Sequence, residues 1–326
     1  MATADQIKAL ISSHAEGDES RFYGVAMQLA AGEAHVGHQR LASELTALID
    51  KVRARPAPRS GPGRPAVLAQ PRGDLGEVLL ASYPSQRLGH LVVKPAVADK
   101  LDRVVTETLR ADELRQHGLQ PLRKLLLVGP PGTGKTMTAA ALAGQLSLPL
   151  FSVRLDGLIT RFLGETAAKL RLVFDAMTQT RGVYFFDEFD ALGGERGSGH
   201  DVGEIRRVLN SFLQFIEQDQ STSVVVAATN HVGLLDRALF RRFDLVVAYD
   251  LPDEEQAALI LRGRLVDLDT TRVDWPAVLV QTHQLSHADV TRAADQAAKD
   301  AVLDRSRVVS TDRLLAAVRD RLAVPR

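Results

Sequence analysis

A glycine-rich stretch, GPPGTGKT at residues 129–136, has the spacing of a phosphate-binding loop. It directly follows the apolar run LLLV and directly precedes a helix-forming segment, MTAAALAGQL, which is the context that such a loop requires. Glycines allow backbone N–H groups to turn inward around phosphates, and the start of a helix favours negative charge. The alternative is a glycine-rich turn without a ligand, and the flanking strand and helix disfavour it.

Two side chains of this loop have expected tasks of their own. Lys135 is expected to reach the β- and γ-phosphates of a nucleotide, and the Thr136 hydroxyl is expected to hold Mg²⁺. The residues expected to bind the phosphates are Pro131, Gly132, Thr133, Gly134, Lys135 and Thr136.

Paired carboxylates end the apolar segment VYFFDEFD at residues 183–190. An apolar strand that ends in two acids suits a cation, so we expect Asp187 to interact with Mg²⁺. Glu188, one residue on, points elsewhere and suits the polarisation of a water molecule for attack on the γ-phosphate. Such a base favours hydrolysis over transfer of the phosphate to a small molecule. The alternative is a pair of solvated acids at the end of a strand.

A third apolar segment, VVVAATN at residues 224–230, ends in Thr229 and Asn230. An uncharged donor at the tip of a central strand can reach the γ-phosphate or the attacking water. Asn also terminates strands without any such role, so this signal is weak alone. Its position after the Asp-Glu segment favours the catalytic interpretation of Asn230.

The pattern of apolar segments predicts an α/β fold. Short runs that are apolar on both sides alternate with amphipathic helices, which indicates a mostly parallel sheet covered on both faces. The expected strands lie within 124–129, 149–155, 182–188, 223–230 and 244–250. After residue 254 the pattern is helical only. The predicted domains are a three-helix unit at 1–52, a Pro/Gly/Arg-rich linker at 53–75, the α/β domain at 76–254 and a helical domain at 255–326.

Composition excludes several classes of function. The 326 residues include 40 Lys and Arg and 40 Asp and Glu, so the zero net charge gives no global attraction to nucleic acid or to an anionic membrane. No cysteine is present, which excludes disulfides and zinc–thiolate sites. The first residues lack the apolar core of a signal peptide, and no apolar run reaches 18 residues. We therefore expect a soluble, cytoplasmic protein.

The three phosphate-site motifs, in this order, resemble those of the AAA ATPases of the AAA+ superfamily, over roughly residues 88–322. The resemblance is to single-module members with pore loops, of the katanin, spastin and FtsH type. It implies a parallel sheet of order 5-1-4-3-2 with a C-terminal helical lid. It also implies hydrolysis of Mg·ATP at the subunit interfaces of a hexameric homo-oligomer.

Further residues are carried over from this resemblance. Gly118 occupies the position of a glycine whose backbone contacts adenine in the family. The segment LDRALFRRFD, residues 235–244, is similar to the family's arginine-finger segment, so Arg241 and Arg242 are expected to project into the neighbouring subunit's nucleotide site. An intrachain salt bridge to a residue such as Asp236 or Asp244 is the alternative for these arginines.

The start of the lid and the pore loop are also recognisable. The segment QLSHADV resembles the Ser-Gly-Ala-Asp start of a lid helix, with His287 in place of the glycine and Ala288 after it, and these two residues are expected beside the adenine. The triplet Phe162-Leu163-Gly164 resembles pore loop 1, which in relatives grips an extended polypeptide. The alternative is that Phe162 and Leu163 simply pack within the domain.

Two classes of function remain open at the sequence level. In the first, a hexameric ATPase remodels, unfolds or threads a protein substrate that docks on the N-terminal helices. In the second, a non-threading switch or assembly factor regulates a partner enzyme, for example a subtilisin-like protease. A nucleic-acid motor is disfavoured because the charge is balanced and no nucleic-acid-binding module is recognisable. The sequence itself contains no H-E-x-x-H protease motif.

Overall fold

The computed structural model describes residue 71, residues 73–154, residue 158 and residues 163–188, 201–231 and 237–324. Contacts divide the chain between residues 64 and 65, and all the described residues belong to the unit Pro65–Arg326. The predicted three-helix unit at 1–52 and most of the predicted linker lie outside the described residues. In the described part, the first helix, α4 (Asp74–Val78), begins within the range 53–75 that was predicted as linker.

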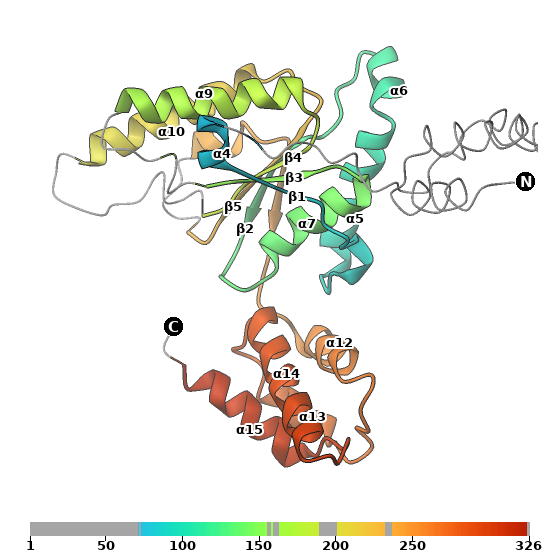
Figure 1. Cartoon of the computed structure of the whole chain (residues 1–326). Coiled ribbons are helices and arrows are strands. Elements are labelled where there is room, and N and C mark those ends of the chain that lie inside the picture. The colour runs from blue at the N-terminus through green and yellow to red at the C-terminus, as the bar shows by residue number, and fades with distance from the viewer. Residues whose placement is uncertain are drawn as a thin grey trace, which may run out of the picture. The chain divides into compact units, whose positions relative to one another are not determined.

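The described residues form a six-stranded sheet of order β1-β3-β4-β5-β2-β6 (Figure 1). Its strands are β1 (Leu79–Ser82), β2 (Lys124–Val128), β3 (Leu150–Val153), β4 (Val183–Phe186), β5 (Val224–Thr229) and β6 (Leu245–Ala248). The strands β2 to β6 pair in parallel and correspond in sequence to the five predicted apolar runs. Read from β6, their order is the predicted 5-1-4-3-2, so the predicted fold class is confirmed.

The sixth strand, β1, was not predicted. It lies at the edge of the sheet and pairs with β3 in the antiparallel direction, with Leu79 opposite Val153. Its side chains alternate between buried and exposed positions. Four residues are too few for such an alternation to be recognised from sequence, and the pairing with β3 selects the strand conformation.

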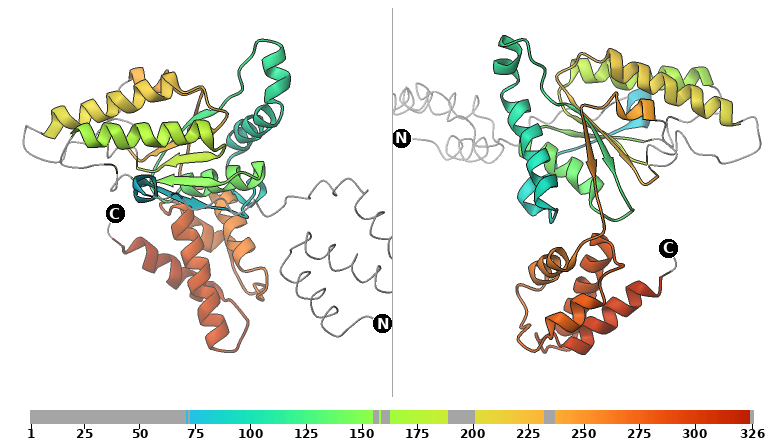
Figure 2. Two further views of the ribbon diagram at one scale, coloured as in Figure 1. Left: turned by 45° about the horizontal axis from the view of Figure 1, so that its top comes forward. Right: turned by 180° about the vertical axis from the view of Figure 1, so that it is seen from behind.

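The helices of the α/β domain cover both faces of the sheet. They are α4, α5 (Pro95–Leu109), α6 (Ala111–Gln116), α7 (Lys135–Leu146), α9 (Leu163–Gln179), α10 (Asp201–Gln218) and α11 (Arg237–Phe240), with a 3-10 turn, η1, at Leu88–His90. One hydrophobic cluster joins α9 and α10 to one face, and a second joins α5 and α7 to the other. Two further views show this separation of the helices by the sheet (Figure 2).

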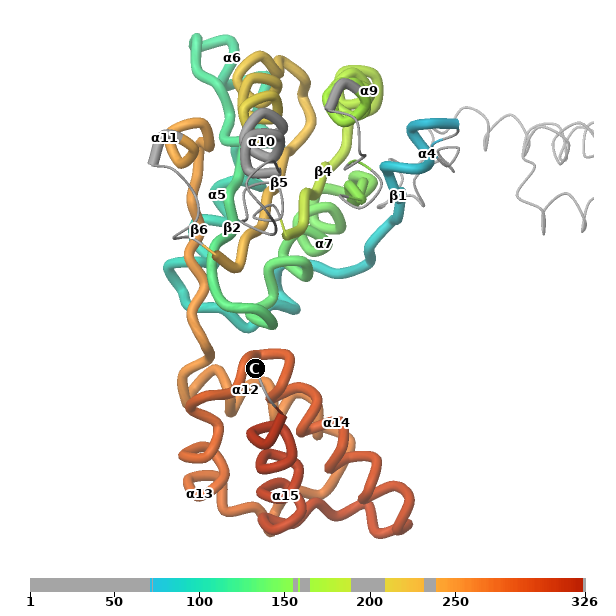
Figure 3. The backbone as a smooth tube through the Cα atoms, turned by 90° about the vertical axis from the view of Figure 1, so that its left-hand side faces the viewer, coloured from blue at the N-terminus to red at the C-terminus, as the bar shows by residue number. Residues whose placement is uncertain are grey.

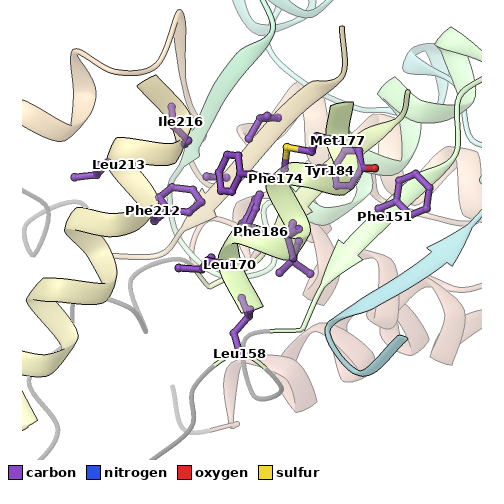
Figure 4. Close-up of a cluster of buried hydrophobic side chains, with 14 of the residues drawn as sticks. Phe151, Leu158, Leu170, Phe174, Met177, Tyr184, Phe186, Phe212, Leu213 and Ile216 are labelled. Atoms are coloured by element: carbon purple, nitrogen blue, oxygen red, sulfur yellow. The ribbon is translucent and has the colours of Figure 1, made fainter. Parts of the chain in front are cut away.

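Neighbouring residues of the parallel strands face opposite clusters, as the pleat requires. Tyr184 and Phe186 of β4 belong to the cluster under α9 and α10, whereas Phe185 belongs to the cluster under α5 and α7. Aromatic rings fill the first cluster (Figure 4). The ring centroids of Phe186 and Phe212 lie 4.9 Å apart in an edge-on arrangement, and those of Phe151 and Tyr184 lie 4.7 Å apart in a stacked one.

Four C-terminal helices share a third hydrophobic cluster. They are α12 (Glu254–Arg264), α13 (Trp275–Val280), α14 (His287–Leu303) and α15 (Thr311–Leu322). Buried alanines on α14, such as Ala293 and Ala297, let neighbouring helices approach closely. Among the described helices, none combines the length and the apolar character that crossing a membrane requires.

Candidate nucleotide site

The three predicted phosphate-site motifs follow three neighbouring parallel strands. The loop at 129–136 follows β2, Asp187 and Glu188 follow β4, and Asn230 follows β5. Because β5 lies between β4 and β2 in the sheet, the three motifs emerge at the same edge. The backbone N–H of Gly129 donates to the carbonyl of Thr229 at 3.3 Å, which joins the loop to the end of β5. The structure therefore brings these sequence-predicted residues together.

Glycine is required at two positions of the loop because other chain segments pass close to it. A Cβ atom on Gly129 would lie 2.3 Å from the carbonyl oxygen of Tyr249, just beyond β6. Gly132 has a φ of 74°, and a Cβ there would lie 2.5 Å from the Ser286 Oγ at the start of α14. The loop is thus fitted against both the last strand and the C-terminal helices. Pro131 lies exposed in the same turn.

Tyr249 also fixes the helix that follows the loop. Its hydroxyl lies 2.7 Å from the Oγ1 of the fully buried Thr138 on α7. Burial raises the pKa of Tyr249 to about 12, so the hydroxyl keeps its proton at neutral pH. This contact joins α7 to the segment that leads from β6 into α12.

Lys135 is buried at the start of α7, with only 6% of its surface exposed. Its ammonium group donates to the carbonyl oxygens of Gly129, at 2.7 Å, and of Pro130, at 2.8 Å. The Thr133 hydroxyl donates to the same Pro130 carbonyl at 2.8 Å. A positive charge is therefore held inside the loop, at the helix N-terminus, where a phosphate group is favoured.

The Thr136 hydroxyl donates a hydrogen bond of 2.8 Å to the Oδ2 of Asp187. A hydroxyl and a carboxylate are the oxygen donors that Mg²⁺ prefers, and Mg²⁺ typically takes one or two carboxylates together with substrate phosphates. In the described part of the chain, no group of three or more His, Cys, Asp or Glu residues could hold a metal ion. Thr136 and Asp187 fit Mg²⁺ bound together with a nucleotide.

Glu188 and Asn230 complete this edge of the sheet. Glu188 has a φ of 49°, in the left-handed region that residues other than glycine rarely adopt, and its N–H donates to the Asp187 Oδ1 at 2.9 Å. The sharp turn leaves the Glu188 side chain exposed while Asp187 is held beside Thr136. Asn230 is half-buried, directly after the fully buried Thr229. Backbone strain of this kind accumulates at functional sites.

The N-terminus of α14 contacts the loop. The Ala288 N–H donates to the Gly132 carbonyl at 3.0 Å. Ser286 is the N-cap residue, and its side chain and that of Asp289 form a capping box. The Ser-His-Ala-Asp segment therefore starts the helix and also brings Ala288 into contact with the glycine-rich loop.

His287 lies in a small pocket formed between α5, β6 and the helices α12 and α14. The residues that line it are Val93, Lys94, Val97, Ala248, Tyr249, Asp250, Gln256 and His287. Burial lowers the pKa of His287, although the nearby Val92 backbone and the Asp253 carboxylate favour the charged ring. Neither ring nitrogen forms a hydrogen bond within the described residues.

Sequence reasoning missed the contribution of the segment before α5 to this pocket. Lys94 forms an ion pair of 2.7 Å with Asp250, and Val93 lines the pocket beside it. The sequence pattern that could have indicated this contribution is the run LVVKP, in which apolar residues and a lysine precede a proline that starts a helix. Val92 itself packs against the cluster of the C-terminal helices.

The structure does not bring Gly118 to the loop, which corrects the expected contact with adenine. Gly118 follows α6 and precedes β2, whereas the loop follows the other end of β2. Leu122, on the way into β2, donates from its N–H to the Glu107 carboxylate near the end of α5. Gly118 therefore lies near the end of the sheet at which β2 begins. The length of β2, about 16 Å, separates it from the loop.

Arg241 and Arg242 also lie at the edge where β2 begins. They immediately precede β6, and Leu245 of β6 is opposite Leu125 of β2. Arg242 forms an intrachain ion pair with Glu217 of α10, with 2.5 Å between its Nε and the Glu217 Oε1. The suggested partner Asp244 is wrong, because its carboxylate accepts hydrogen bonds from the backbone of Arg123 and Lys124. Asp236 lies outside the described residues.

The expected pore loop falls mostly outside the described residues. Phe162 is not among them, whereas Leu163 and Gly164 form the first residues of α9, with nothing described of their side chains. Neither the pore-loop interpretation nor the packing alternative is tested by this placement.

Comparison with known proteins shows what this chain is similar to. Residues 125–251 match the family model described as ATPase family associated with various cellular activities (AAA). An uncharacterised AAA family ATPase, y4kL, of Sinorhizobium fredii is 42% identical over 202 residues, which are 61% of this chain and 60% of that protein. The ATP-dependent zinc metalloprotease FtsH 2 of Sphaerobacter thermophilus is 35% identical over 223 residues, 66% of this chain and 34% of that protein. The chain thus spans less than two thirds of both relatives.

One solved structure supports the fold. The AAA domain of FIGL-1 aligns with a TM-score of 0.61 over 76% of this chain and 87% of that domain, at 24% sequence identity. At this identity the likeness concerns the arrangement of strands and helices.

Proposed function

We propose that this chain hydrolyses Mg·ATP at the site formed by the ends of β2, β4 and β5, because residues 125–251 match the model of the AAA ATPase family. The observation that carries the proposal is the contact between the Thr136 hydroxyl and the Asp187 carboxylate, one residue from the buried Lys135. A cation within the loop and two oxygen donors beside it suit a triphosphate and its metal ion. The word ATP-dependent in the name of the FtsH relative supports ATP as the nucleotide.

Each residue of the site has a task in this proposal. Lys135 and the loop N–H groups bind the phosphates, and Glu188 accepts the proton of the attacking water while Asn230 orients that water or the γ-phosphate. Thr136 and Asp187 would hold Mg²⁺, which neutralises charge on the β- and γ-phosphates. The adenine ring lies beside His287 and Ala288, and the helix that carries these two residues contacts Gly132.

We propose further that hydrolysis is completed between subunits of a homo-oligomeric ring, a hexamer as in the resemblance. The position of the arginines supports this step. Arg241 and Arg242 stand at the opposite edge of the sheet from the chain's own loop, separated by the five residues of β2. An arginine side chain does not span that distance, so an arginine that stabilises the transferring phosphate comes from a neighbouring chain.

The energy of hydrolysis is used to remodel, unfold or thread a protein substrate, and this substrate docks on the N-terminal unit. The resemblance of residues 162–164 to pore loop 1 motivates this part. The second candidate is a switch that regulates a partner enzyme without threading, for example a protease.

A Glu188→Gln variant tests the ring and the nucleotide site together. The variant removes the proposed base but keeps the loop, so with Mg·ATP it is expected to bind nucleotide without turnover and to assemble into a species of about six subunits, measured by native mass spectrometry. Lys135→Ala is the control and should bind little nucleotide. A Glu188→Gln protein that hydrolyses ATP at the wild-type rate, or that stays monomeric while saturated with ATP, contradicts the proposal.

A further inference from the structure

A short chain of buried hydrogen bonds ends at Gly134, the last glycine of the phosphate loop. The Thr138 hydroxyl donates to the Gly134 carbonyl at 3.0 Å, and the Tyr249 hydroxyl oxygen lies 2.7 Å from the Thr138 Oγ1. Because a hydroxyl has one proton, and that of Thr138 is directed to Gly134, Tyr249 is the donor in the second contact. The chain of hydrogen bonds therefore runs from Tyr249 through Thr138 to the loop.

The surroundings of the two hydroxyl groups preserve these hydrogen bonds. Thr138 is fully buried on α7, and Tyr249 is 5% exposed in the hydrophobic cluster under α5 and α7. Burial raises the pKa of Tyr249 to about 12, so the donor keeps its proton at neutral pH. A buried polar group that loses its partner is costly because water cannot take the partner's place. Each hydrogen bond of the chain is therefore maintained in the folded protein.

The backbone of Tyr249 contacts the opposite end of the phosphate loop. Its N–H donates to the Val128 carbonyl at 2.7 Å, and a Cβ on Gly129, the first residue of the loop, would lie 2.3 Å from its carbonyl oxygen. Figure 3 shows β6 beside β2, with the chain continuing from β6 towards α12. A single residue beyond β6 therefore contacts the first glycine of the loop directly and the last glycine through Thr138.

The Gly134 carbonyl determines the direction of the next backbone N–H group. Gly134 is the N-cap residue of α7, and its carbonyl also accepts from the Thr138 N–H at 2.8 Å. The peptide bond is planar and trans, so the N–H of Lys135 points opposite to this carbonyl. With the carbonyl directed along the helix, the Lys135 N–H is directed out of the helix N-terminus, where a phosphate group is favoured. The orientation of this one peptide therefore affects how the loop binds a phosphate.

We infer that Tyr249 is a positioning residue of the phosphate loop, which acts through Thr138 to fix the Gly134–Lys135 peptide in the orientation that binds the phosphates. This inference rests on the proposed binding of Mg·ATP by the loop. It adds to the site two residues that lie outside the glycine-rich motif and are 111 positions apart in the sequence.

Removal of single hydroxyl groups tests this inference. Tyr249→Phe keeps the ring and loses only the donor, so its dissociation constant for Mg·ADP, measured by isothermal titration calorimetry, is expected to rise by about 5- to 10-fold. Thr138→Val removes both hydroxyl contacts and is expected to raise it by about 10-fold or more. Thr138→Ser keeps the hydroxyl and should bind Mg·ADP within about twofold of the wild type.

The double variant, Tyr249→Phe with Thr138→Val, shows whether the two hydroxyl groups act as one chain. If they do, the double variant binds Mg·ADP as weakly as Thr138→Val alone, because the tyrosine has no further route to the loop. If Thr138→Val does not fold, Tyr249→Phe decides the inference by itself.

A second buried tyrosine provides the matched control. The Tyr184 hydroxyl donates to the carbonyls of Ala176, at 3.1 Å, and Thr180, at 3.0 Å, in the cluster under α9 and α10 on the other face of the sheet. Tyr184→Phe should lower the thermal stability, as Tyr249→Phe does, but leave the dissociation constant for Mg·ADP within about twofold of the wild type.

Three results would overturn the inference. They are a wild-type dissociation constant for Tyr249→Phe, an equal loss of affinity in Tyr184→Phe, and losses that add up in the double variant. A wild-type protein that binds Mg·ADP but does not hydrolyse ATP instead contradicts the proposed function, and the comparison of dissociation constants still decides the role of Tyr249.

Discussion

Thr136 and Asp187 meet between the start of α7 and the end of β4, with 2.8 Å between the hydroxyl oxygen and the carboxylate Oδ2. The two residues are 51 positions apart in the sequence, so this contact depends on the parallel pairing of the strands that precede them. It places two ligands of the kind that Mg²⁺ binds beside the phosphate loop.

Removal of the Thr136 hydroxyl should weaken the binding of Mg²⁺ during ATP hydrolysis. Thr136→Val keeps the side-chain shape, so we expect a folded protein whose apparent Mg²⁺ affinity during ATP hydrolysis falls by about 10- to 100-fold. Thr136→Ser keeps the hydroxyl and is the matched control. Titration of ATPase activity with Mg²⁺ measures the change, and an unchanged titration curve for the valine variant would exclude Thr136 as a ligand.

Two glycines in helices should respond to alanine in opposite directions. A Cβ on Gly144 of α7 would lie 1.9 Å from the Gln86 carbonyl oxygen, so Gly144→Ala should lower the free energy of unfolding by about 1–3 kcal/mol. A Cβ on Gly263 of α12 meets nothing within 4 Å, so Gly263→Ala should raise it by about 0.5–1 kcal/mol. Urea denaturation measures both. Equal effects of the two substitutions would contradict the close approach of residues 84–86 to α7.

Much of the site was predictable because its residues follow local patterns. The parallel strands are apolar on both faces, and the phosphate loop joins a strand to a helix in one continuous segment. Asp187 and Asn230 each end a predicted strand, and the carboxyl ends of parallel strands meet at one edge of the sheet. Local sequence patterns were therefore enough to predict at which end of the parallel strands the site lies.

The remainder depends on contacts between distant segments. The sequence offers 40 acidic residues as partners for Arg242, and nothing in its local pattern selects Glu217, 25 positions away. Val93 reaches the pocket of His287 only because α5 packs beside the end of β6. Gly118 was placed at the site by resemblance alone, and the direction of β2 puts it at the opposite edge of the sheet.

The stability of the chain should depend on pH through His287. Burial lowers the pKa of this imidazole below the ordinary value of 6.5, against the opposing influence of Asp253. Lys94, Tyr249 and Asp250 also face the pocket. The ring binds a proton more readily in the unfolded chain, so its contribution is fully present above pH 6.5 and is lost as the pH falls through the lowered pKa.

A His287→Gln variant isolates this contribution. The amide does not titrate, so the free energy of unfolding of the variant should fall less between pH 7 and pH 5 than that of the wild type. Chemical denaturation at several pH values provides the measurement. His283→Gln is the control, because His283 is exposed on the same group of helices and should leave the pH dependence closer to that of the wild type. Identical pH profiles for the wild type and His287→Gln would contradict the burial of a neutral ring.

The placement of the arginines at the far edge of the sheet predicts complementation between inactive subunits. A Lys135→Ala subunit lacks the phosphate-binding lysine but keeps both arginines, whereas a subunit with Arg241→Ala and Arg242→Ala keeps the loop and lacks the arginines. Each protein alone should be inactive. In rings mixed at equal amounts, an intact loop faces an intact arginine pair at about one quarter of the interfaces, so about a quarter of the wild-type ATPase activity should return.

Mixing Lys135→Ala with a chain that carries all three substitutions is the matched control and should restore nothing, because no intact loop is then present. Native mass spectrometry shows whether both chains enter one ring. If mixed rings form and remain inactive, each site needs its own chain's arginines, and the hydrolysis proposed between subunits is wrong. Recovery requires the arginines to act across the interface, since β2 separates them from the phosphate loop of their own chain.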